Sequence, residues 1–522
     1  MKKENRKAAA KRVRRISGLL LGSLLAAGLL TGCGGGTSGN DAANSATNAP
    51  AADAPETTEA PAAKEPYTVT MLTQGEQQED LPRIMEKVNE ILVRDLNMKL
   101  NLIVSPYGSL SQQRQLMLTS GEALDLVYLD ASSAIGFMNN GQILDLSDLI
   151  DQYGTNIKKY WGEEAKSANI GGFVFGVPNL NEVGNIPAIG MRKDMVEKYQ
   201  IDVDSIQSLE DLEPVLAMIK EKEPGISPVH ICADQPPISR QLSVIDQMID
   251  GIAVLDNSGM DSTTIIPVTQ SKAYREKCEL FHRWYEAGYI NADAATTTVQ
   301  FESAFKAGST FSAIMVWHPM SPNQFGGVDM VYAFLGEHRA MSGATGNSDY
   351  GIATNSKDPE KAMQMLDYLY GSQEVAQLLN WGEEGTDWVY VDKDQNVVGW
   401  PEGVDSNNAT YHAQLAWALP NQFMASSWDG VYPPDVFEQM LKFNKEGKRS
   451  KAFGFTYNTK PVENELTALK NVQEKYSISL ETGAVDPEEY LAQYENELKQ
   501  AGIDKLIEEK QRQFDEWLAE NP

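Results

Sequence analysis

The sequence predicts an α/β protein whose central element is a doubly wound sheet of parallel strands. Two observations favour this fold class. Short β-rich segments alternate with helical patterns between residues 67 and 129, and strands that alternate with helices usually pair in parallel. The chain also continues for about 456 residues beyond Pro66, which is too long for one hydrophobic core and indicates two or more domains.

The first strand and the first helix are expected at the start of this folded part. Residues 67–72 (YTVTML) have the composition of a short strand. Residues 80–82 (DLP) then supply an N-cap and a proline for the first turn of a helix. Apolar residues recur at helical spacing after this start, at Ile84, Val88, Ile91 and Leu92.

Two more strands enclose a second helix. Residues 98–104 (MKLNLIV) and 125–129 (DLVYL) predict the strands. Ser109 or Ser111 is expected to cap the helix between them, and Gly121 is expected to end it. This order of elements is the basis of the predicted parallel sheet.

Helical patterns return in the second half of the chain. Asp358, followed by a proline, predicts the start of a helix that ends at Gly371. Residues 486–489 (DPEE) predict the start of another, which Gly502 stops. A last helix is expected over residues 504–520.

Ligands of doubly wound sheets bind beyond the carboxyl ends of the strands. The first predicted strand is followed by Gln74 and Glu76, and the third by Asp130 and Ser132. Gln74 and Asp130 are therefore candidate ligand-binding residues.

The N-terminus has the pattern of an export signal. Residues 1–15 carry eight Lys or Arg and one Glu, and residues 16–30 form an uncharged, mostly apolar run. That run is shorter than the roughly 20 residues that a membrane-spanning helix needs. A basic segment, a short apolar segment and small residues before a cleavage site describe a signal peptide.

A cysteine follows this signal in the sequence Leu30-Thr31-Gly32-Cys33, which resembles the bacterial lipobox. The resemblance implies a lipoprotein signal peptide over residues 1–32 and a lipid on Cys33. An ordinary secretory signal with an incidental cysteine is the alternative. Residues 34–66 contain no Val, Ile, Leu, Met, Phe, Tyr or Trp, so residues 33–66 are expected to be a disordered, lipid-anchored linker.

The charge and the cysteines limit the partners. The formal net charge of −29 argues against nucleic acid, whose phosphates need basic patches, and leaves the lipid anchor as the expected membrane contact. Cys232 and Cys278 could pair outside the cell, but the sequence cannot place them within bonding distance. No CxxC motif and no helix-spaced histidines occur, so neither a metal nor another cofactor is expected.

Several stretches, in order, resemble the extracellular solute-binding proteins of ABC importers, family 1, the carbohydrate-type lipoproteins. The later stretches are similar to a large lipoprotein subgroup with a C-terminal domain of unknown function. The resemblance covers nearly all of residues 67–522. The stretches are DLVYLD (125–130), GFVFGVP (172–178), MRKDMVEKYQIDV (191–203), SLEDL (208–212), FKAGSTFSAIMVW (305–317), YGIATNSKDPEKAMQMLDYL (350–369), NWGEEGTDWVY (380–390) and AFGF (452–455).

This resemblance implies the two-lobed, type II periplasmic-binding-protein fold: doubly wound sheets joined by a hinge, with a helical C-terminal extension. The first lobe is expected over residues 67–180, with about 345–400 returning to it. The second is expected over residues 181–344, together with about 401–522.

The resemblance also implies a function. The protein would capture an extracellular carbohydrate, in particular an oligosaccharide, between its lobes and deliver it to the transmembrane subunits of an ABC permease. It would act as a lipid-anchored monomer on the extracytoplasmic face of the cell membrane, and not as an enzyme. The alternatives are an oligopeptide-binding receptor and a lipid-anchored glycoside hydrolase, which needs two carboxyl groups about 5–9 Å apart. The motifs GxSxG, HExxH and the P-loop are absent.

Aromatic residues are the first candidates for a sugar site, because their flat faces can stack on the C–H patches of a sugar. Five of the nine Trp lie between residues 381 and 428. The resemblance makes Trp317, at the end of an apolar strand, a stacking residue. The further aromatic candidates are His318, Trp381 and Trp417.

The remaining candidates are polar residues near predicted strand ends or in loops. Asn179 follows the stretch GFVFGVP, and Gln235 lies in a predicted loop of the second lobe. Glu384 and Asn421 lie close to tryptophans in sequence, and Asn421 could equally serve the core. With Gln74 and Asp130 they complete the expected set of polar ligand contacts.

Overall fold

The computed structural model describes residues 65–321, 323–325, 327–346, 348–413 and 415–521. The predicted signal peptide over residues 1–32, Cys33 and nearly all of the expected linker lie outside the described residues. The account below concerns the compact unit that these described residues form.

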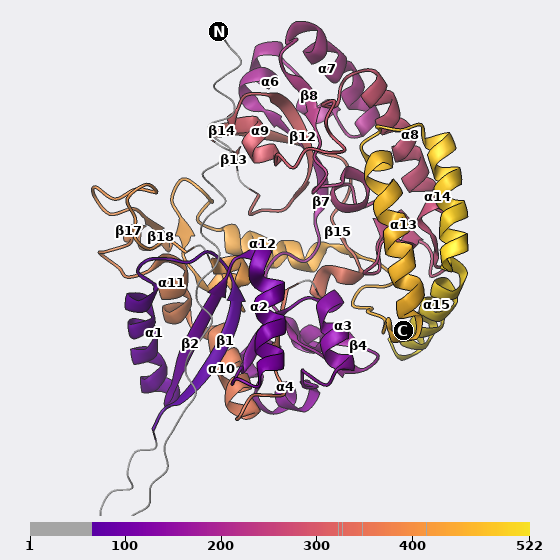
Figure 1. The fold of residues 1–522 in the computed structure, drawn as a ribbon. Coiled ribbons are helices and arrows are strands. Elements are labelled where there is room, and N and C mark those ends of the chain that lie inside the picture. The colour runs from indigo at the N-terminus through magenta and orange to yellow at the C-terminus, as the bar shows by residue number, and fades with distance from the viewer. Residues whose placement is uncertain (1–64, 322, 326, 347, 414, 522) are drawn as a thin grey trace, which may run out of the picture. The chain divides into compact units, whose positions relative to one another are not determined.

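The first sheet has the strand order β2-β1-β3-β16-β6 (Figure 1). β1 pairs in parallel with both β2 and β3, which confirms the predicted βαβαβ start. β16 instead runs antiparallel to β3 and β6. The strands are β1 (Tyr67–Gln74), β2 (Met98–Ser105), β3 (Leu126–Leu129), β6 (Val177–Pro178) and β16 (Asp349–Ile352).

The antiparallel strand corrects the expectation of an all-parallel sheet. A parallel strand needs a crossover connection, usually a helix on one face of the sheet. β16 has no helix between it and the preceding strand, and the chain reaches it through the short 3₁₀ turn Ser342–Thr345. The chain therefore enters this sheet from the opposite end.

Helices cover this sheet. α1 buries Ile84, Val88, Ile91 and Leu92, as its spacing predicts. α2 begins at Tyr107, with Pro106 at its N-cap and no side-chain cap, so the expected caps Ser109 and Ser111 are wrong; its end at Gly121 is confirmed. The helices are α1 (Leu81–Leu96), α2 (Tyr107–Ser120), α3 (Ala131–Asn139), α4 (Ser147–Tyr153), α5 (Thr155–Trp161), α10 (Pro359–Gly371) and α11 (Gln373–Trp381).

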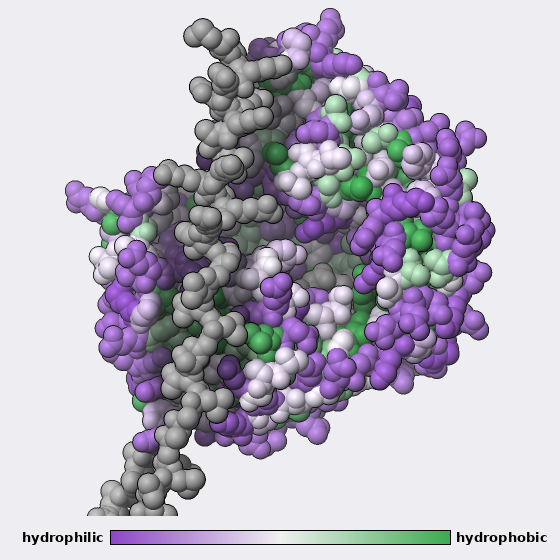
Figure 2. Space-filling model, in the orientation of Figure 1, coloured by the Kyte–Doolittle hydropathy of each residue, from purple (hydrophilic) through white to green (hydrophobic). Residues whose placement is uncertain are grey.

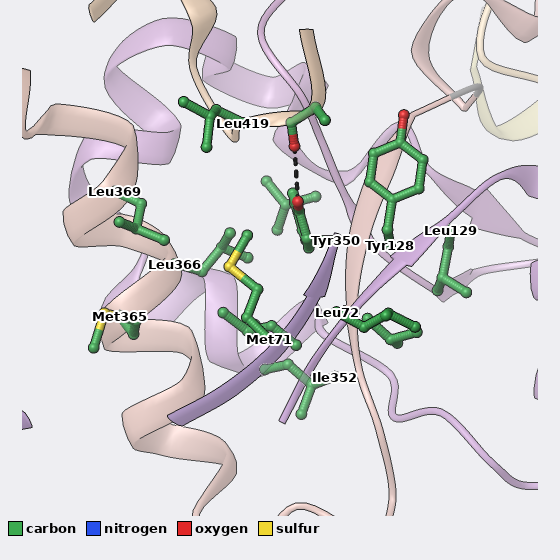
Figure 3. Packing of buried hydrophobic residues seen from close by; sticks show 14 of the residues in the cluster. Met71, Leu72, Tyr128, Leu129, Tyr350, Ile352, Met365, Leu366, Leu369 and Leu419 are labelled. Atoms are coloured by element: carbon green, nitrogen blue, oxygen red, sulfur yellow. Dashed lines mark hydrogen bonds between the residues drawn. The ribbon is translucent and has the colours of Figure 1, made fainter. Parts of the chain in front are cut away.

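The core of this part lies between the sheet and its helices. Figure 3 shows Met71 and Leu72 of β1 near Ile352, with Leu366 of α10 beside them. The hydroxyl of Tyr350 is buried there and donates to the backbone oxygen of Ala418 at 2.7 Å. Residues far along the chain therefore complete the first core.

The second sheet has the strand order β13-β14-β7-β12-β8. β12 pairs in parallel with β8 but antiparallel to β7, and β14 is also antiparallel to β7, so this sheet is mixed as well. The strands are β7 (Ile186–Arg192), β8 (Ser227–His230), β12 (Thr310–Trp317), β13 (Gln324–Phe325) and β14 (Val328–Phe334). The helices nearby are α6 (Lys193–Tyr199), α7 (Leu209–Lys222), α8 (Lys272–Glu286) and α9 (Phe301–Lys306).

Three segments run between the two sheets: residues 179–185, the segment around residues 339–340 and the segment around residues 448–449. Residues 179–185 lead from β6 to β7, and Asn185 bridges to Arg339. β15 (Arg339–Ala340) in turn pairs with β20 (Lys448–Arg449). Gly184 has a φ of +80°, and a Cβ there would lie 2.3 Å from the carbonyl oxygen of Arg339, so this crossing requires glycine.

The C-terminal helices pack on the second core. Figure 1 shows α13, α14 and α15 side by side next to α8, and their apolar residues belong to the cluster that contains β12 and α8 residues. The surface of this region seen in Figure 2 is mostly hydrophilic. These helices are α13 (Glu463–Glu481), α14 (Pro487–Ala501) and α15 (Ile503–Glu520). The preceding helix, α12 (Val436–Glu446), instead contributes Met440 and Phe443 to the first core.

A smaller sheet, in the order β17-β18-β19, packs its own cluster around Trp381, Trp388 and Trp428. Its strands are β17 (Val389–Asp392), β18 (Val397–Gly399) and β19 (Ser427–Trp428). A second small sheet, in the order β11-β10-β9, consists of β9 (Ile245–Asp246), β10 (Ala253–Asp256) and β11 (Ile266–Pro267), and a hairpin joins β4 (Asn169–Ile170) to β5 (Phe173–Val174).

The lobe boundaries remain a prediction. Tyr411, Leu419 and Phe443 belong to the first core, although residues from about 401 onward were expected in the second lobe. Cys232 and Cys278 are both buried free thiols. Within the described part of the chain, no helix has the length and apolar character needed to cross a bilayer.

Candidate ligand-binding site

Two neighbouring cavities lie beside the crossing segments, and Glu182 and Trp417 line both of them. The first, called here the polar cavity, has a volume of about 360 Å³. The second, the aromatic cavity, has a volume of about 400 Å³. Because they share two residues, the two cavities lie directly beside each other.

One wall of the polar cavity comes from the first sheet. Asp130 follows β3 and caps α3, accepting a hydrogen bond from the backbone N–H of Ser133 at 2.9 Å. The guanidinium of Arg114 lies 3.6 Å from the same carboxylate. These contacts fix the carboxylate, and 42% of the Asp130 side chain stays exposed to the cavity side and solvent.

Asn179 forms a buried part of the same wall. Its Nδ2 donates to Ser348 Oγ at 2.9 Å, and that hydroxyl lies 2.7 Å from the hydroxyl of Tyr128. Its Oδ1 is buried and has no partner among the described residues. This oxygen is covered by protein atoms, so a ligand hydroxyl reaches it only if the wall shifts, and the cost of an unpaired buried acceptor favours such a shift.

The opposite wall is a loop that follows β9. Asp246, Gln247, Met248 and Ile249 line the cavity. Asp246 accepts hydrogen bonds from the backbone N–H of Ser342 at 2.9 Å and from its hydroxyl at 2.5 Å. The loop is thus tied to the crossing segment that carries Ser342.

The shared wall between the cavities is one hydrogen-bonded pair. The indole Nε1 of Trp417 donates to Glu182 Oε1 at 3.2 Å. The ring of Trp417 lies 6.3 Å from that of Tyr128 and is 40% exposed. A large, fixed and exposed indole of this kind can stack on a sugar ring.

Four rings form one side of the aromatic cavity. His412 lies 4.9 Å from Trp381, 4.5 Å from Trp400 and 4.4 Å from Trp428 between ring centres. Burial lowers the pKa of His412 to about 4, so its imidazole is neutral at pH 7. Trp381 donates its Nε1 to the backbone oxygen of Ser426 at 3.1 Å, which fixes the ring.

His318 lies at the rim of the aromatic cavity. Burial lowers its pKa, while the charge of Glu182 acts in the opposite direction. Its Nδ1 has no hydrogen-bond partner in the described part of the chain. This nitrogen is buried, so a ligand reaches it only if the cavity wall shifts.

Half of the predicted site residues come together at these cavities. Asp130 and Asn179 line the polar cavity, and His318 and Trp381 line the aromatic one. Trp417 lines both.

The structure places the other five elsewhere. Trp317 packs on Phe334 and Phe443, with ring centres 4.9 and 6.2 Å away. Asn421 is buried, and its side chain bonds to the backbone of Tyr370 and Phe423. The other three line neither cavity: Gln74 ends β1, Gln235 bonds to Gln241 and Gln300, and Glu384 lies in a groove beside α1 and α11.

Sequence reasoning did not select several lining residues. Trp400 and Trp428 belong to the tryptophan-rich stretch that the composition had already marked, so this signal could have found them. Glu182, Arg339 and the 246–249 loop carry no such signal. Among the described residues, no group of three or more His, Cys, Asp or Glu could hold a metal ion.

Comparisons with known proteins show which proteins this chain resembles as a whole. A carbohydrate ABC transporter substrate-binding protein of Streptococcus pneumoniae is 26% identical over 463 residues, covering 86% of this chain and 91% of that protein. The crystal structure of the N-glycan transport solute-binding protein NgtS from Streptococcus pneumoniae is 25% identical, with a TM-score of 0.76, and the match covers 87% of this chain and 100% of NgtS. An extracellular solute-binding protein from Bifidobacterium longum subsp. infantis, 15% identical with a TM-score of 0.59, covers 86% of this chain and 98% of its own, and shares the fold.

Two families match consecutive parts of the chain. Residues 451–519 match a domain of unknown function, DUF3502. Residues 94–376, more than half of the chain, match the family described as bacterial extracellular solute-binding protein. The two-lobed α/β fold with a helical C-terminal region is therefore confirmed, and the chain belongs to the bacterial extracellular solute-binding proteins.

Proposed function

We propose that this protein captures an extracellular oligosaccharide in its joined cavities and delivers it to an ABC permease. The names of two relatives support a carbohydrate ligand: one is a carbohydrate ABC transporter substrate-binding protein, and the other is an N-glycan transport solute-binding protein. Crystal structures of the latter include complexes with Man5GlcNAc and Man1GlcNAc.

The observation that carries the proposal is the pairing of unlike cavities through Trp417 and Glu182. A sugar presents hydroxyls at its edge and C–H groups on its faces. The polar cavity supplies acceptors such as the Asp130 carboxylate, and the aromatic cavity supplies flat rings. One sugar unit per cavity satisfies both kinds of contact, which favours an oligosaccharide over a monosaccharide.

Closure of the two sheets on the ligand is the expected mechanism. A ligand shifts such an equilibrium only through its better contacts with the closed form.

The remaining parts of the proposal concern location and chemistry. A lipid on Cys33 holds the monomer at the extracytoplasmic face, within reach of the permease. No bond is made or broken in the ligand. Asp246 already accepts bonds from Ser342, and Glu182 accepts one from Trp417, which supports binding rather than acid–base catalysis.

The test is a thermal-shift and calorimetry panel on the chain from Cys33 onward, with Man5GlcNAc, Man1GlcNAc, kestose and a mixture of short peptides. A ligand present at 100 times its Kd stabilises the folded state by about 2.7 kcal/mol. We expect a shift with at least one glycan and none with peptides. A shift with peptides alone would overturn the carbohydrate assignment, and release of new reducing ends would overturn the binding role.

A further inference from the structure

The C-terminal helices reach the ligand-facing loop from behind. The loop of residues 245–251 presents Gln247, Met248 and Ile249 to the polar cavity. A third cavity, called here the rear cavity, has a volume of about 440 Å³ and lies on the other side of the loop. Gln247, Asp250 and Gly251 line it. The loop therefore separates the polar cavity from the rear cavity.

The backbone of the 245–251 loop is strained. Met248 has a φ of +45° and Ile249 a φ of +81°. A β-branched residue rarely adopts a positive φ, and such a conformation persists only when surrounding contacts hold it. Because the rear cavity leaves room for the loop to move, the contacts around the loop determine its position.

The strongest of these contacts comes from the last helix. Lys510 of α15 donates to Asp250 Oδ2 at 2.8 Å and to the backbone oxygen of Ala253 at 2.6 Å. The side chains of Lys510 and Asp250 are 0% and 1% exposed. The hydroxyl of Tyr457 also donates to Asp250 Oδ2, at 2.6 Å.

Asp250 also bonds to the backbone at the end of the loop, so its contact with Lys510 restrains the loop. Its Oδ1 accepts hydrogen bonds from the backbone N–H groups of Ile252 at 2.8 Å and Ala253 at 3.0 Å. Its backbone oxygen accepts from Gln473 Nε2 of α13 at 3.1 Å. Asp250 therefore joins two C-terminal helices to the end of the loop, α15 through its carboxylate and α13 through its backbone oxygen.

A second connection reaches the front of the loop. Glu481 of α13 is buried and accepts from the backbone N–H groups of Ile238 and Ser239 and from the Ser239 hydroxyl. The backbone oxygen of Ser239 accepts from Gln247 Nε2 at 2.6 Å. Gln247, which lines the polar cavity, is therefore held through one intermediate residue.

We propose that the C-terminal helices, which match a domain of unknown function, position the 245–251 loop for ligand binding, with Lys510 as the main positioning residue. Lys510, Tyr457, Gln473 and Glu481 all fall within residues 451–519 of that match. The part of this proposal that concerns affinity rests on the proposed carbohydrate function. The part that concerns the loop does not.

The test compares Lys510→Met with Lys505→Met. Lys505 lies on the same helix and pairs with Glu465 at 2.7 Å, but at the surface, so its loss controls for the removal of an ammonium group. Hydrogen exchange of residues 246–253 is measured without ligand, and the Kd for Man5GlcNAc is measured by calorimetry. For Lys510→Met we expect at least tenfold faster exchange in the loop and at least fivefold weaker binding, with neither change in Lys505→Met.

The double variant Asp250→Asn/Lys510→Met separates positioning from stability. It removes both buried charges, so its melting temperature should recover relative to Lys510→Met, because no unpaired buried carboxylate remains. The link to α15 is still missing, so loop exchange should stay fast and binding weak. Recovery of exchange and affinity together with stability would overturn the positioning role.

The outcomes also distinguish this inference from the proposed function. Unchanged loop exchange in Lys510→Met, or faster exchange with wild-type affinity, would overturn the inference. A wild-type protein that binds none of the glycans would overturn the proposed function, while faster exchange in Lys510→Met would still support control of the loop by α15.

Discussion

The aromatic and polar cavities differ in how the chain builds them. Most of the aromatic cavity comes from one stretch, residues 380–437, with His318 and Glu182 at its rim. The polar cavity draws on the ends of two strands, two crossing segments and the 245–251 loop. Most residues of the aromatic cavity are therefore close together in sequence, whereas the polar cavity forms only when both sheets are folded and connected.

Because of this difference, we expect the two cavities to respond differently when the protein closes on a ligand. The rings of the aromatic cavity are fixed by contacts with each other, such as the 4.6 Å approach of Trp381 and Trp428. The groups of the polar cavity are fixed by contacts that cross between separate segments, such as Asp246 to Ser342. Closure should therefore rearrange the polar cavity more than the aromatic one.

Trp417 gives the largest expected effect, because it belongs to both cavities. Trp417→Ala should weaken glycan binding by about 2 kcal/mol, or roughly thirtyfold, through the loss of a stacked face. Trp317→Ala is the matched control, since Trp317 packs on Phe334 and Phe443 instead. Calorimetry of both variants is the measurement. Equal losses of affinity would mean that Trp317 is also a contact residue.

His412 provides a test of the aromatic cavity alone. Its folded pKa of about 4 lies below its ordinary value of 6.5, so the unfolded chain binds its proton more readily. Its neutral form therefore contributes stability above pH 6.5, and this contribution is lost as the pH falls from 6.5 to 4. Allowing for partial exposure, the loss is about 1 to 2 kcal/mol.

His412→Phe should keep the ring contacts and remove this pH dependence. Urea unfolding at pH 7.5 and pH 4.5 would measure it, with the difference between the two pH values smaller in the variant than in the wild type. An identical pH profile in both proteins would show that the imidazole is already solvated in the folded state.

The same contrast explains what the sequence could predict. The β1-α1-β2-α2-β3 start, the end of α2 at Gly121 and the helices α10 and α14 follow from local spacing and capping, and they are confirmed. The tryptophan-rich stretch likewise marked the aromatic cavity. Trp317 lies at a strand end, as expected, but the orientation of its ring depends on α12, which is distant in sequence.

The polar cavity was only partly predictable for the same reason. Asp130 and Asn179 follow strands, and strand ends are visible in a sequence. Glu182 and the 246–249 loop have no local pattern that marks them, because their position depends on the crossing segments and on the C-terminal helices. Gln74 shows the converse: it ends a strand as expected, yet it lines neither cavity.

Asn179 gives the smallest effect and tests the polar cavity alone. Asn179→Leu removes an acceptor that has no partner among the described residues, so affinity should fall by about 1 kcal/mol, or roughly fivefold. The free energy of unfolding should change by less, because the lost bond to Ser348 is offset by the removal of an unpaired buried oxygen. Gln74→Leu, which removes the same amide outside the cavities, should leave affinity unchanged. Calorimetry and urea unfolding of the two variants decide it: a large loss of stability without a loss of affinity in Asn179→Leu would make Asn179 part of the core and leave ligand recognition to the aromatic cavity.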